Sequence, residues 1–124
     1  MTVERIVVEG LGRLPQFAHA GIAGGIVYVS GTLGTTIGLE LADGIAAQTS
    51  QALHNMGRIL NAAGASWDDV AKVSVFVTDM AEFGAMNEAY GVFFDGIPPA
   101  RITVGGVDLA LGARVEMECI AHLP

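Results

Sequence analysis

The segment spanning residues 45–63 constrains the fold most strongly, because its apolar side chains recur every three or four positions. This period predicts one long helix with a single apolar face. Asp43 is placed to act as its N-cap, and Gly64 favours the left-handed residue that ends a helix. The predicted face comprises Ile45, Thr49, Ala52, Leu53, Met56, Ile59, Leu60 and Ala63. A helix of this kind needs a second layer against which to pack.

A second helix is predicted after Asp79. The spacing of Asp79 and Glu82 has the form of a capping box, which marks a helix start. Gly96 and the pair Pro98-Pro99 end the helical pattern. The residues expected on its packed face are Phe83, Met86, Tyr90, Phe93 and Phe94.

The second layer is predicted by segments in which apolar and polar residues alternate with period two, as strands require. The clearest segment is 70–77; the others are 3–8, 26–30, 101–107 and 114–121, with a sixth strand expected around 17–20 or 32–35. The last two long segments are expected to pair as a hairpin through residues 108–113. Together the elements predict an α+β fold in one domain over residues 1–124, with a mixed sheet of five to six strands and two helices on one face.

The other face of this sheet is expected to be half ionic and half apolar. If the strands share one phase, it carries Arg101, Thr103, Glu116, Glu118, Phe76 and Ile120. The chain is 52% hydrophobic and only 15% charged, which is low for a soluble domain. We therefore expect this face to pack against further copies of the chain.

Charge and composition exclude several classes of function. The formal net charge of −7 argues against nucleic acid as a partner, because phosphate binding needs clustered Lys and Arg. No apolar run is long enough to span a membrane, so we expect no membrane partner. The start of the chain lacks the pattern of a secretory signal and Cys119 is the single cysteine, which together fit a reducing, cytoplasmic compartment. The three histidines share no metal-ligand spacing, and no glycine-rich segment opens a helix, so we expect neither metal nor cofactor.

The strongest candidate for chemistry is Arg101, which follows Pro98-Pro99 at the start of a predicted strand. A guanidinium holds a carboxylate with two parallel hydrogen bonds, which a lysine cannot do. Glu116 lies on the next predicted strand and would face Arg101 if the hairpin turned between Asp108 and Leu109. This pairing has two interpretations, a structural ion pair across the strands or a ligand site, and the spacing does not decide between them.

Several short motifs, taken together, resemble the Rid superfamily, the YjgF-type reactive-intermediate deaminases. They are Ser30-Gly31-Thr32, Ala63-Gly64-Ala65 with Trp67-Asp68-Asp69-Val70, Val75-Phe76-Val77-Thr78-Asp79, Met86-Asn87-Glu88-Ala89-Tyr90, Pro99-Ala100-Arg101 and Val115-Glu116-Met117. The resemblance implies a chorismate-mutase-like α+β fold and a homotrimer with its sites at the subunit interfaces. It also implies hydrolysis of enamine and imine acids, such as 2-aminoacrylate or 2-iminobutanoate, to 2-oxo acids and ammonia.

The resemblance also implies residue roles. Arg101 would bind the substrate carboxylate, and Glu116 would orient the water that attacks the imine carbon. Gly31 would offer backbone contacts, whereas Asn87 and Thr103 would line the pocket.

The chain departs from the family pattern at two of the expected pocket positions. Phe17 stands where many deaminating members carry a tyrosine, and Thr103 stands where a cysteine is frequent. These departures leave open a second interpretation, a non-catalytic or regulatory member that binds small carboxylates. A third activity, ribonuclease, fits poorly with the charge of −7.

Overall fold

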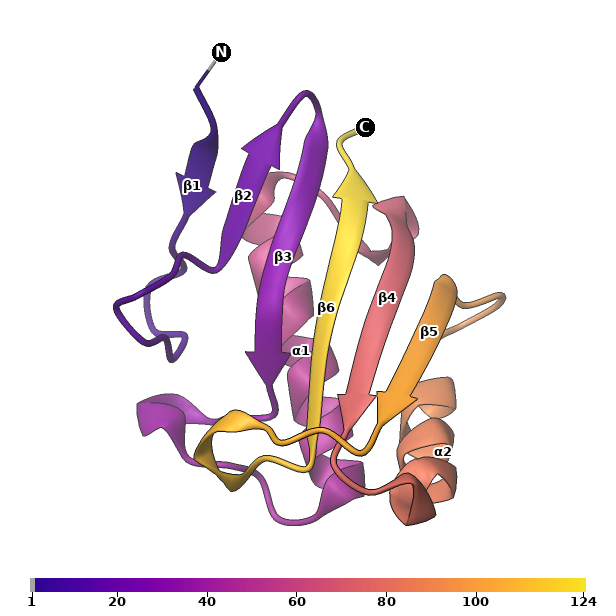
Figure 1. Ribbon diagram of the computed structural model, residues 1–124. Coiled ribbons are helices and arrows are strands. Elements are labelled where there is room, and N and C mark those ends of the chain that lie inside the picture. Colours follow the sequence, from indigo (N-terminus) through magenta and orange to yellow (C-terminus); the bar gives the residue numbers. More distant parts are fainter. Residues whose placement is uncertain (1) are drawn as a thin grey trace.

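The computed structural model describes residues 2–124, so Met1 of the predicted domain lies outside the described residues. Figure 1 shows a twisted sheet with both helices behind one of its faces. The elements are β1 (Glu4–Ile6), β2 (Ala20–Ala23), β3 (Ile26–Leu33), α1 (Ile45–Ala63), β4 (Val70–Val77), α2 (Phe83–Phe93), β5 (Ala100–Gly105) and β6 (Val115–His122). This arrangement confirms the predicted α+β fold with two helices on one face of a mixed sheet.

The strand order in the sheet is β1-β2-β3-β6-β4-β5, and only the β4–β5 pair is parallel. The prediction that the last two strands form a hairpin is therefore wrong. Helix α2 crosses over from β4 to β5, which makes β5 a parallel edge strand. The chain then passes beneath the sheet, and β6 enters between β3 and β4 (Figure 1).

The sixth strand is β2. It was expected around residues 17–20 or 32–35, and of these residues β2 contains only Ala20. It forms a tight hairpin with β3 in which Ala23 pairs with Ile26. The two connecting residues, Gly24 and Gly25, both have positive φ values, of 57° and 77°. Turns of this kind match the twist of antiparallel strands and favour glycine. The glycines in and around β2 obscure the alternation of apolar and polar residues by which so short a strand could be predicted. Residues 32 and 33 belong to β3, which is longer than predicted.

Helix α1 has the predicted limits and packs over the centre of the sheet. Its side chains Leu53, Met56 and Leu60 are fully buried, and truncating such a residue to alanine costs about 2–5 kcal/mol. Gly64 ends the helix at φ 90°, as predicted. The predicted N-cap is wrong, because Gly44 occupies that position and no side chain caps the helix.

A short 3₁₀ turn, Met80–Glu82, leads into α2. The Asp79 carboxylate accepts a hydrogen bond from the Ala81 N–H at 2.9 Å, as a cap should. Glu82 does not complete the capping box, because its carboxylate pairs with Arg114 at 3.0 Å. That ion pair is half exposed, so it contributes at most about 1 kcal/mol.

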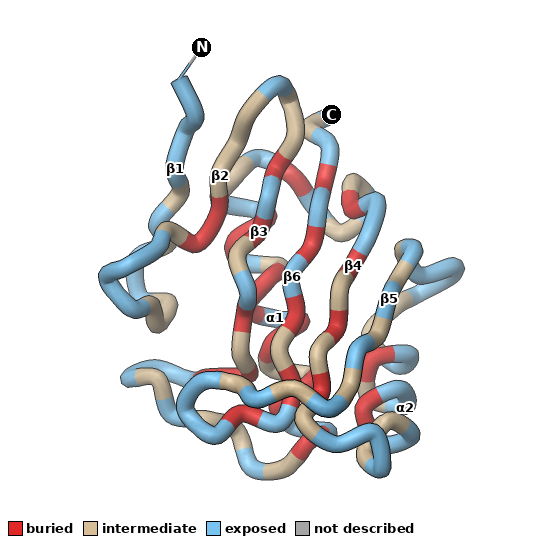
Figure 2. The backbone as a smooth tube through the Cα atoms, viewed as in Figure 1, coloured by how far each residue is buried: buried red, intermediate tan, exposed pale blue. Residues whose placement is uncertain are grey.

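The sheet face opposite the helices carries Tyr28, Phe76, Glu116, Glu118 and Ile120, and Figure 2 shows strands on which buried and more exposed residues alternate. Tyr28 is 51% exposed and Ile120 is 39% exposed. We call this surface the open face. In the described part of the chain no helix is long and apolar enough to cross a membrane.

The predicted placement of Arg101 and Thr103 on the open face is wrong. Arg101 pairs with Val73 and Thr103 pairs with Val75, and both valines point into the core beneath the helices. Neighbouring residues in register point to the same side of a sheet. The side chains of Arg101 and Thr103 therefore lie on the helix face, so the phase of β5 is opposite to the expected one.

Candidate functional site

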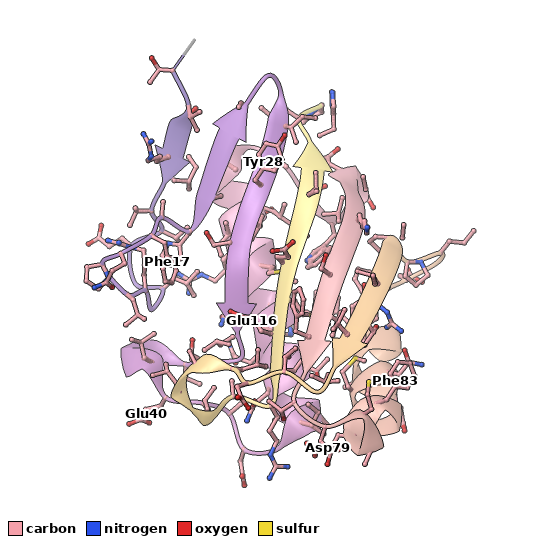
Figure 3. All side chains as sticks on the ribbon, in the orientation of Figure 1. Phe17, Tyr28, Glu40, Asp79, Phe83 and Glu116 are labelled. Atoms are coloured by element: carbon pink, nitrogen blue, oxygen red, sulfur yellow. The ribbon has the colours of Figure 1, made fainter. Side chains whose placement is uncertain are left out.

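A cavity of about 110 Å³ opens beside Glu116, between the lower ends of β3 and β6 and the loops around them. Three of the predicted site residues line it, namely Phe17, Gly31 and Glu116. In Figure 3, Phe17 lies in the loop before β2, and Glu116 lies near the start of β6. We call this site the Glu116 cavity.

Gly31 is needed for its close approach to the Glu116 carboxylate. A Cβ atom at residue 31 would lie 2.7 Å from Glu116 Oε2, so any side chain would displace the carboxylate. The pairing of β3 with β6 is irregular here, because two residues of β3, Ser30 and Gly31, lie opposite the single residue Glu118. Bulges of this kind redirect side chains and are frequent beside active sites.

The Glu116 carboxylate is half-buried, and no group among residues 2–124 forms a hydrogen bond with it. Burial raises the pKa of this carboxyl above its ordinary value, and the negative charge of Glu118 raises the pKa further. A carboxylate with a raised pKa and free lone pairs is suited to accept a proton from water.

Two buried side chains fix the loops that surround the Glu116 cavity. His19 accepts a hydrogen bond from the Val8 N–H at its Nδ1, and its Nε2 lies 3.1 Å from the Gly12 carbonyl oxygen. The first bond assigns the ring proton to Nε2, which therefore donates to Gly12. From α1, Asn55 donates to the carbonyl oxygens of Leu33 and Thr35, at 3.1 and 2.9 Å. Both walls of the cavity are thus held by hydrogen bonds from the core.

The remaining predicted site residues gather at the far edge of the sheet, which we call the Arg101 edge. The Arg101 guanidinium carbon lies 4.6 Å from the centre of the Tyr90 ring and 5.8 Å from that of Phe83. Stacking of this kind contributes about 0.5–2 kcal/mol. Asn87 lies between the two rings on the same side of α2 and is exposed, and Thr103 follows Arg101 on the same face of β5.

The hydroxyls of Tyr90 and Thr103 are both buried and lack a hydrogen-bond partner within the described residues. Burial raises the pKa of Tyr90 to about 12, although the positive charge of Arg101 opposes this shift. Unpaired buried hydroxyls are rare in folded proteins. The interior beside the Arg101 edge therefore contains two polar groups that are closed off from solvent and unsatisfied by the residues that the structure describes.

Arg101 and Glu116 do not meet within one chain. They project from opposite faces of the sheet, because Arg101 pairs with Val73 and Glu116 pairs with Phe76. Their strands are separated by β4, and the two residues are offset by three positions along it, so their Cα atoms lie roughly 14 Å apart. The structural ion pair, one of the two interpretations of the sequence, is therefore wrong for the isolated chain.

Tyr90 is a site residue that the sequence assigned only to packing. Its spacing of seven residues from Phe83 puts both rings on one side of α2, and that spacing was the available signal. The sequence does not reveal which face of the sheet carries the Arg101 side chain, because that depends on the phase of β5. Cys119 is buried in the core, and burial raises its pKa to about 12, so the thiol stays protonated.

Among the described residues, no group of three or more histidine, cysteine, aspartate or glutamate side chains is arranged to hold a metal ion.

Comparison with known families identifies the chain. The sequence profile of the family described as "Endoribonuclease L-PSP", the YjgF/Rid family, matches residues 11–123. The chain belongs to the Rid family. This membership confirms the resemblance inferred from the sequence motifs.

Two curated relatives of this Rid protein have names that specify deamination. A mouse protein named 2-iminobutanoate/2-iminopropanoate deaminase is 40% identical over 77% of this chain and 72% of its own length. An Arabidopsis thaliana protein named Reactive Intermediate Deaminase A, chloroplastic, is 38% identical over 89% of this chain. The matched region spans only 60% of the Arabidopsis protein.

Solved structures of the family share the fold over nearly the whole chain. The crystal structure of E. coli TdcF with bound serine has a TM-score of 0.89 at 28% identity, and the match covers 98% of this chain and all of that one. The mixed sheet with helices on one face is therefore the fold of the family.

Proposed function

We propose that this Rid protein hydrolyses 2-imino and 2-enamino acids to 2-oxo acids and ammonia. The observation that carries the proposal is the Glu116 carboxylate, which faces a cavity beside Gly31 with no hydrogen-bond partner of its own among residues 2–124. The names of relatives at 38–40% identity support imine deamination as the reaction class. Substrates of the 2-iminobutanoate and 2-aminoacrylate type are proposed.

The residues present suffice for this reaction. Arg101 holds the substrate carboxylate with two charge-assisted hydrogen bonds. Glu116 accepts a proton from a water molecule as the water oxygen bonds to the imine carbon, and it passes this proton to the imine nitrogen, which gives a neutral carbinolamine. Glu116 then takes the hydroxyl proton and delivers it to the amino nitrogen as the C–N bond breaks, so that ammonia leaves and the 2-oxo acid forms. An enamine first gains a proton at carbon and loses one from nitrogen, which converts it to the imine. No covalent enzyme intermediate is required.

The active unit that we propose is a homotrimer in which each site combines Glu116 of one copy with Arg101 of the next. Separation of the two side chains on opposite faces supports this arrangement, since one small substrate cannot reach both within a chain. The apolar part of the open face gives copies a surface to bury. Asn87 and Thr103 would then join Phe17 and Gly31 around the substrate.

A non-catalytic member that binds small carboxylates is the alternative, and Phe17 is the observation that favours it. Its ring lines the Glu116 cavity at a position where a hydroxyl would help to orient water. The description of TdcF with bound serine is consistent with binding of small amino acids or their analogues in this fold. RNA cleavage, which the family description names, is disfavoured by the net charge of −7.

We propose a cytoplasmic location, with neither nucleic acid nor a membrane as a partner.

The test is a coupled assay in which a pyridoxal-phosphate-dependent threonine dehydratase generates 2-iminobutanoate and release of 2-oxobutanoate is followed. Wild-type protein should accelerate release, whereas Arg101→Ala should lose about 100-fold or more in kcat/KM because the bidentate clamp is gone. Normal kcat/KM in Arg101→Ala would remove the clamp assignment. If the wild-type protein binds 2-oxobutanoate but accelerates nothing, the non-catalytic alternative replaces the proposal.

A further inference from the structure

The walls of the Glu116 cavity offer mainly apolar contacts to a ligand, although several polar side chains line them. Ser30 donates to the Ala18 carbonyl oxygen at 2.6 Å, and Thr32 donates to that of Ser30 at 2.8 Å. Arg13 donates to the Phe17 carbonyl oxygen at 2.9 Å. His19 and Asn55 also donate to backbone carbonyl oxygens. These hydrogen bonds engage most of the polar side chains of the walls other than Thr35 and Glu116, so the side chain of a ligand would contact mainly leucines.

Two of those leucines have an unusual backbone conformation. Leu39 has a φ of 63° and Leu111 has a φ of 60°, and they are the only non-glycine residues at positive φ among residues 2–124. Leucine adopts this left-handed region at an energetic cost, and strain of this kind is concentrated at ligand sites. Both residues line the Glu116 cavity, although they lie in turns 72 positions apart in the sequence.

The Leu39 side chain also closes the cavity on the side of the N-terminal loop. A Cβ atom at Gly12 would lie 2.7 Å from Leu39 Cδ2, so the Leu39 side chain packs directly against the Gly12 backbone. Gly12 is itself held by His19, and the turn that carries Leu39 is closed by a hydrogen bond from the Thr36 N–H to the Glu40 carbonyl oxygen. Leu39 is thus fixed from both sides, as a preformed wall requires.

We infer that Leu39 and Leu111 determine specificity by forming the pocket for the side chain of the imino acid. This inference rests on the proposed function and goes beyond it by naming the side-chain class. The cavity volume of about 110 Å³ is smaller than the roughly 150 Å³ that admits benzene. An isobutyl side chain fits such a pocket, an ethyl side chain fills it incompletely, and an aromatic ring exceeds it.

Stable 2-oxo acids test this inference without turnover. Calorimetric titration would compare 4-methyl-2-oxopentanoate, which has an isobutyl side chain, with 2-oxobutanoate and phenylpyruvate. The variants Leu39→Gly and Leu111→Gly remove each side chain and keep a residue that tolerates positive φ. Ile37→Ala is the matched control, because Ile37 lies in the same turn as Leu39 but is 85% exposed.

We expect the wild-type protein to bind 4-methyl-2-oxopentanoate about tenfold more tightly than 2-oxobutanoate, and phenylpyruvate more weakly than either. Each glycine variant should lose most of that preference, because its affinity for 4-methyl-2-oxopentanoate falls more than its affinity for 2-oxobutanoate, and Ile37→Ala should resemble wild type. A preference that survives in both glycine variants, or a wild-type protein that binds none of the acids, overturns the inference. A wild-type protein that shows the preference but hydrolyses no imine refutes the proposed function alone.

Discussion

At the Glu116 cavity, two loops are fixed by buried side chains before any ligand arrives, whereas at the Arg101 edge one guanidinium lies on the rings of a single helix. His19 and Asn55 hold the cavity by four hydrogen bonds to backbone groups. The Arg101 edge instead contains two buried hydroxyls without partners among the described residues. The chain therefore fixes the shape of the cavity by itself, whereas the edge presents a cation that is held by packing on two rings. In the proposed assembly, the cavity supplies shape and the edge supplies a charge to the next copy.

Substitution of Glu116 has the largest expected effect on the cavity. Glu116→Gln keeps the shape but removes the group that accepts a proton from water, so kcat should fall about 10²–10⁴-fold while KM changes little. In the wild type, kcat should rise with pH as the carboxyl ionises, and this rise should vanish in the variant. Steady-state kinetics across pH measure both effects. Equal losses in kcat and in binding would show that Glu116 has a structural role instead.

The raised pKa of Glu116 also predicts how the stability of the protein changes with pH. The folded state holds the Glu116 proton more tightly than the unfolded chain does, and this tighter binding contributes to the free energy of unfolding. The contribution is complete at pH values below the pKa of Glu116 in the unfolded chain. It is lost as the pH rises through the pKa of Glu116 in the folded state. In an Arg101→Ala background, which removes the guanidinium of any second copy, Glu116→Gln should raise the melting temperature at about pH 8 and not at about pH 4. A variant that is less stable at the higher pH would contradict the assigned burial.

Removal of the His19 hydrogen bonds that hold the N-terminal loop should have the next largest effect, and it should act on stability. His19→Leu leaves the Val8 N–H and the Gly12 carbonyl oxygen unpaired, which should cost about 2–4 kcal/mol in the free energy of unfolding. His19→Gln is the matched control, because its amide offers both an acceptor and a donor and should recover most of that loss. Denaturant unfolding measures both variants. If His19→Leu were as stable as His19→Gln, the two hydrogen bonds would not hold the loop.

Removal of the stack at the Arg101 edge should act on binding. Tyr90→Leu takes away the ring 4.6 Å from the Arg101 guanidinium, so KM should rise up to about tenfold with kcat nearly unchanged. Tyr90→Phe keeps the ring and removes an unpaired hydroxyl, so its KM should match that of the wild type. A raised KM in the phenylalanine variant would assign the role to the hydroxyl instead of the ring.

The smallest effect is expected at Phe17. Phe17→Tyr adds a hydroxyl at the rim of the Glu116 cavity, where Phe17 is 43% exposed, and should change kcat by a few-fold at most. A much larger gain in kcat would mean that the missing hydroxyl limits this chain, which would strengthen the interpretation of a weakly catalytic carboxylate binder.

The limits of the sequence-based predictions follow from the same comparison. The helices, the strand Val70–Val77 and the left-handed Gly64 were predictable, because periodicity and end signals are local. The pairing of β5 with β4 was not, since a crossover through α2 leaves no local mark and reverses the face on which Arg101 lies. The Glu116 cavity was equally hidden, because Leu39 and Leu111 meet there only through the conformations of two distant turns.

The central claim, that each site combines Arg101 and Glu116 from two copies, is tested most directly by mixing two inactive variants. Arg101→Ala and Glu116→Gln would be unfolded together at equal concentrations, refolded, and assayed for 2-iminobutanoate hydrolysis. Random assembly gives each shared site a one-half chance of an intact glutamate and a one-half chance of an intact arginine, so about a quarter of wild-type activity should return. If each site used both residues of one chain, the mixture would stay as inactive as its parts, and the account would be contradicted.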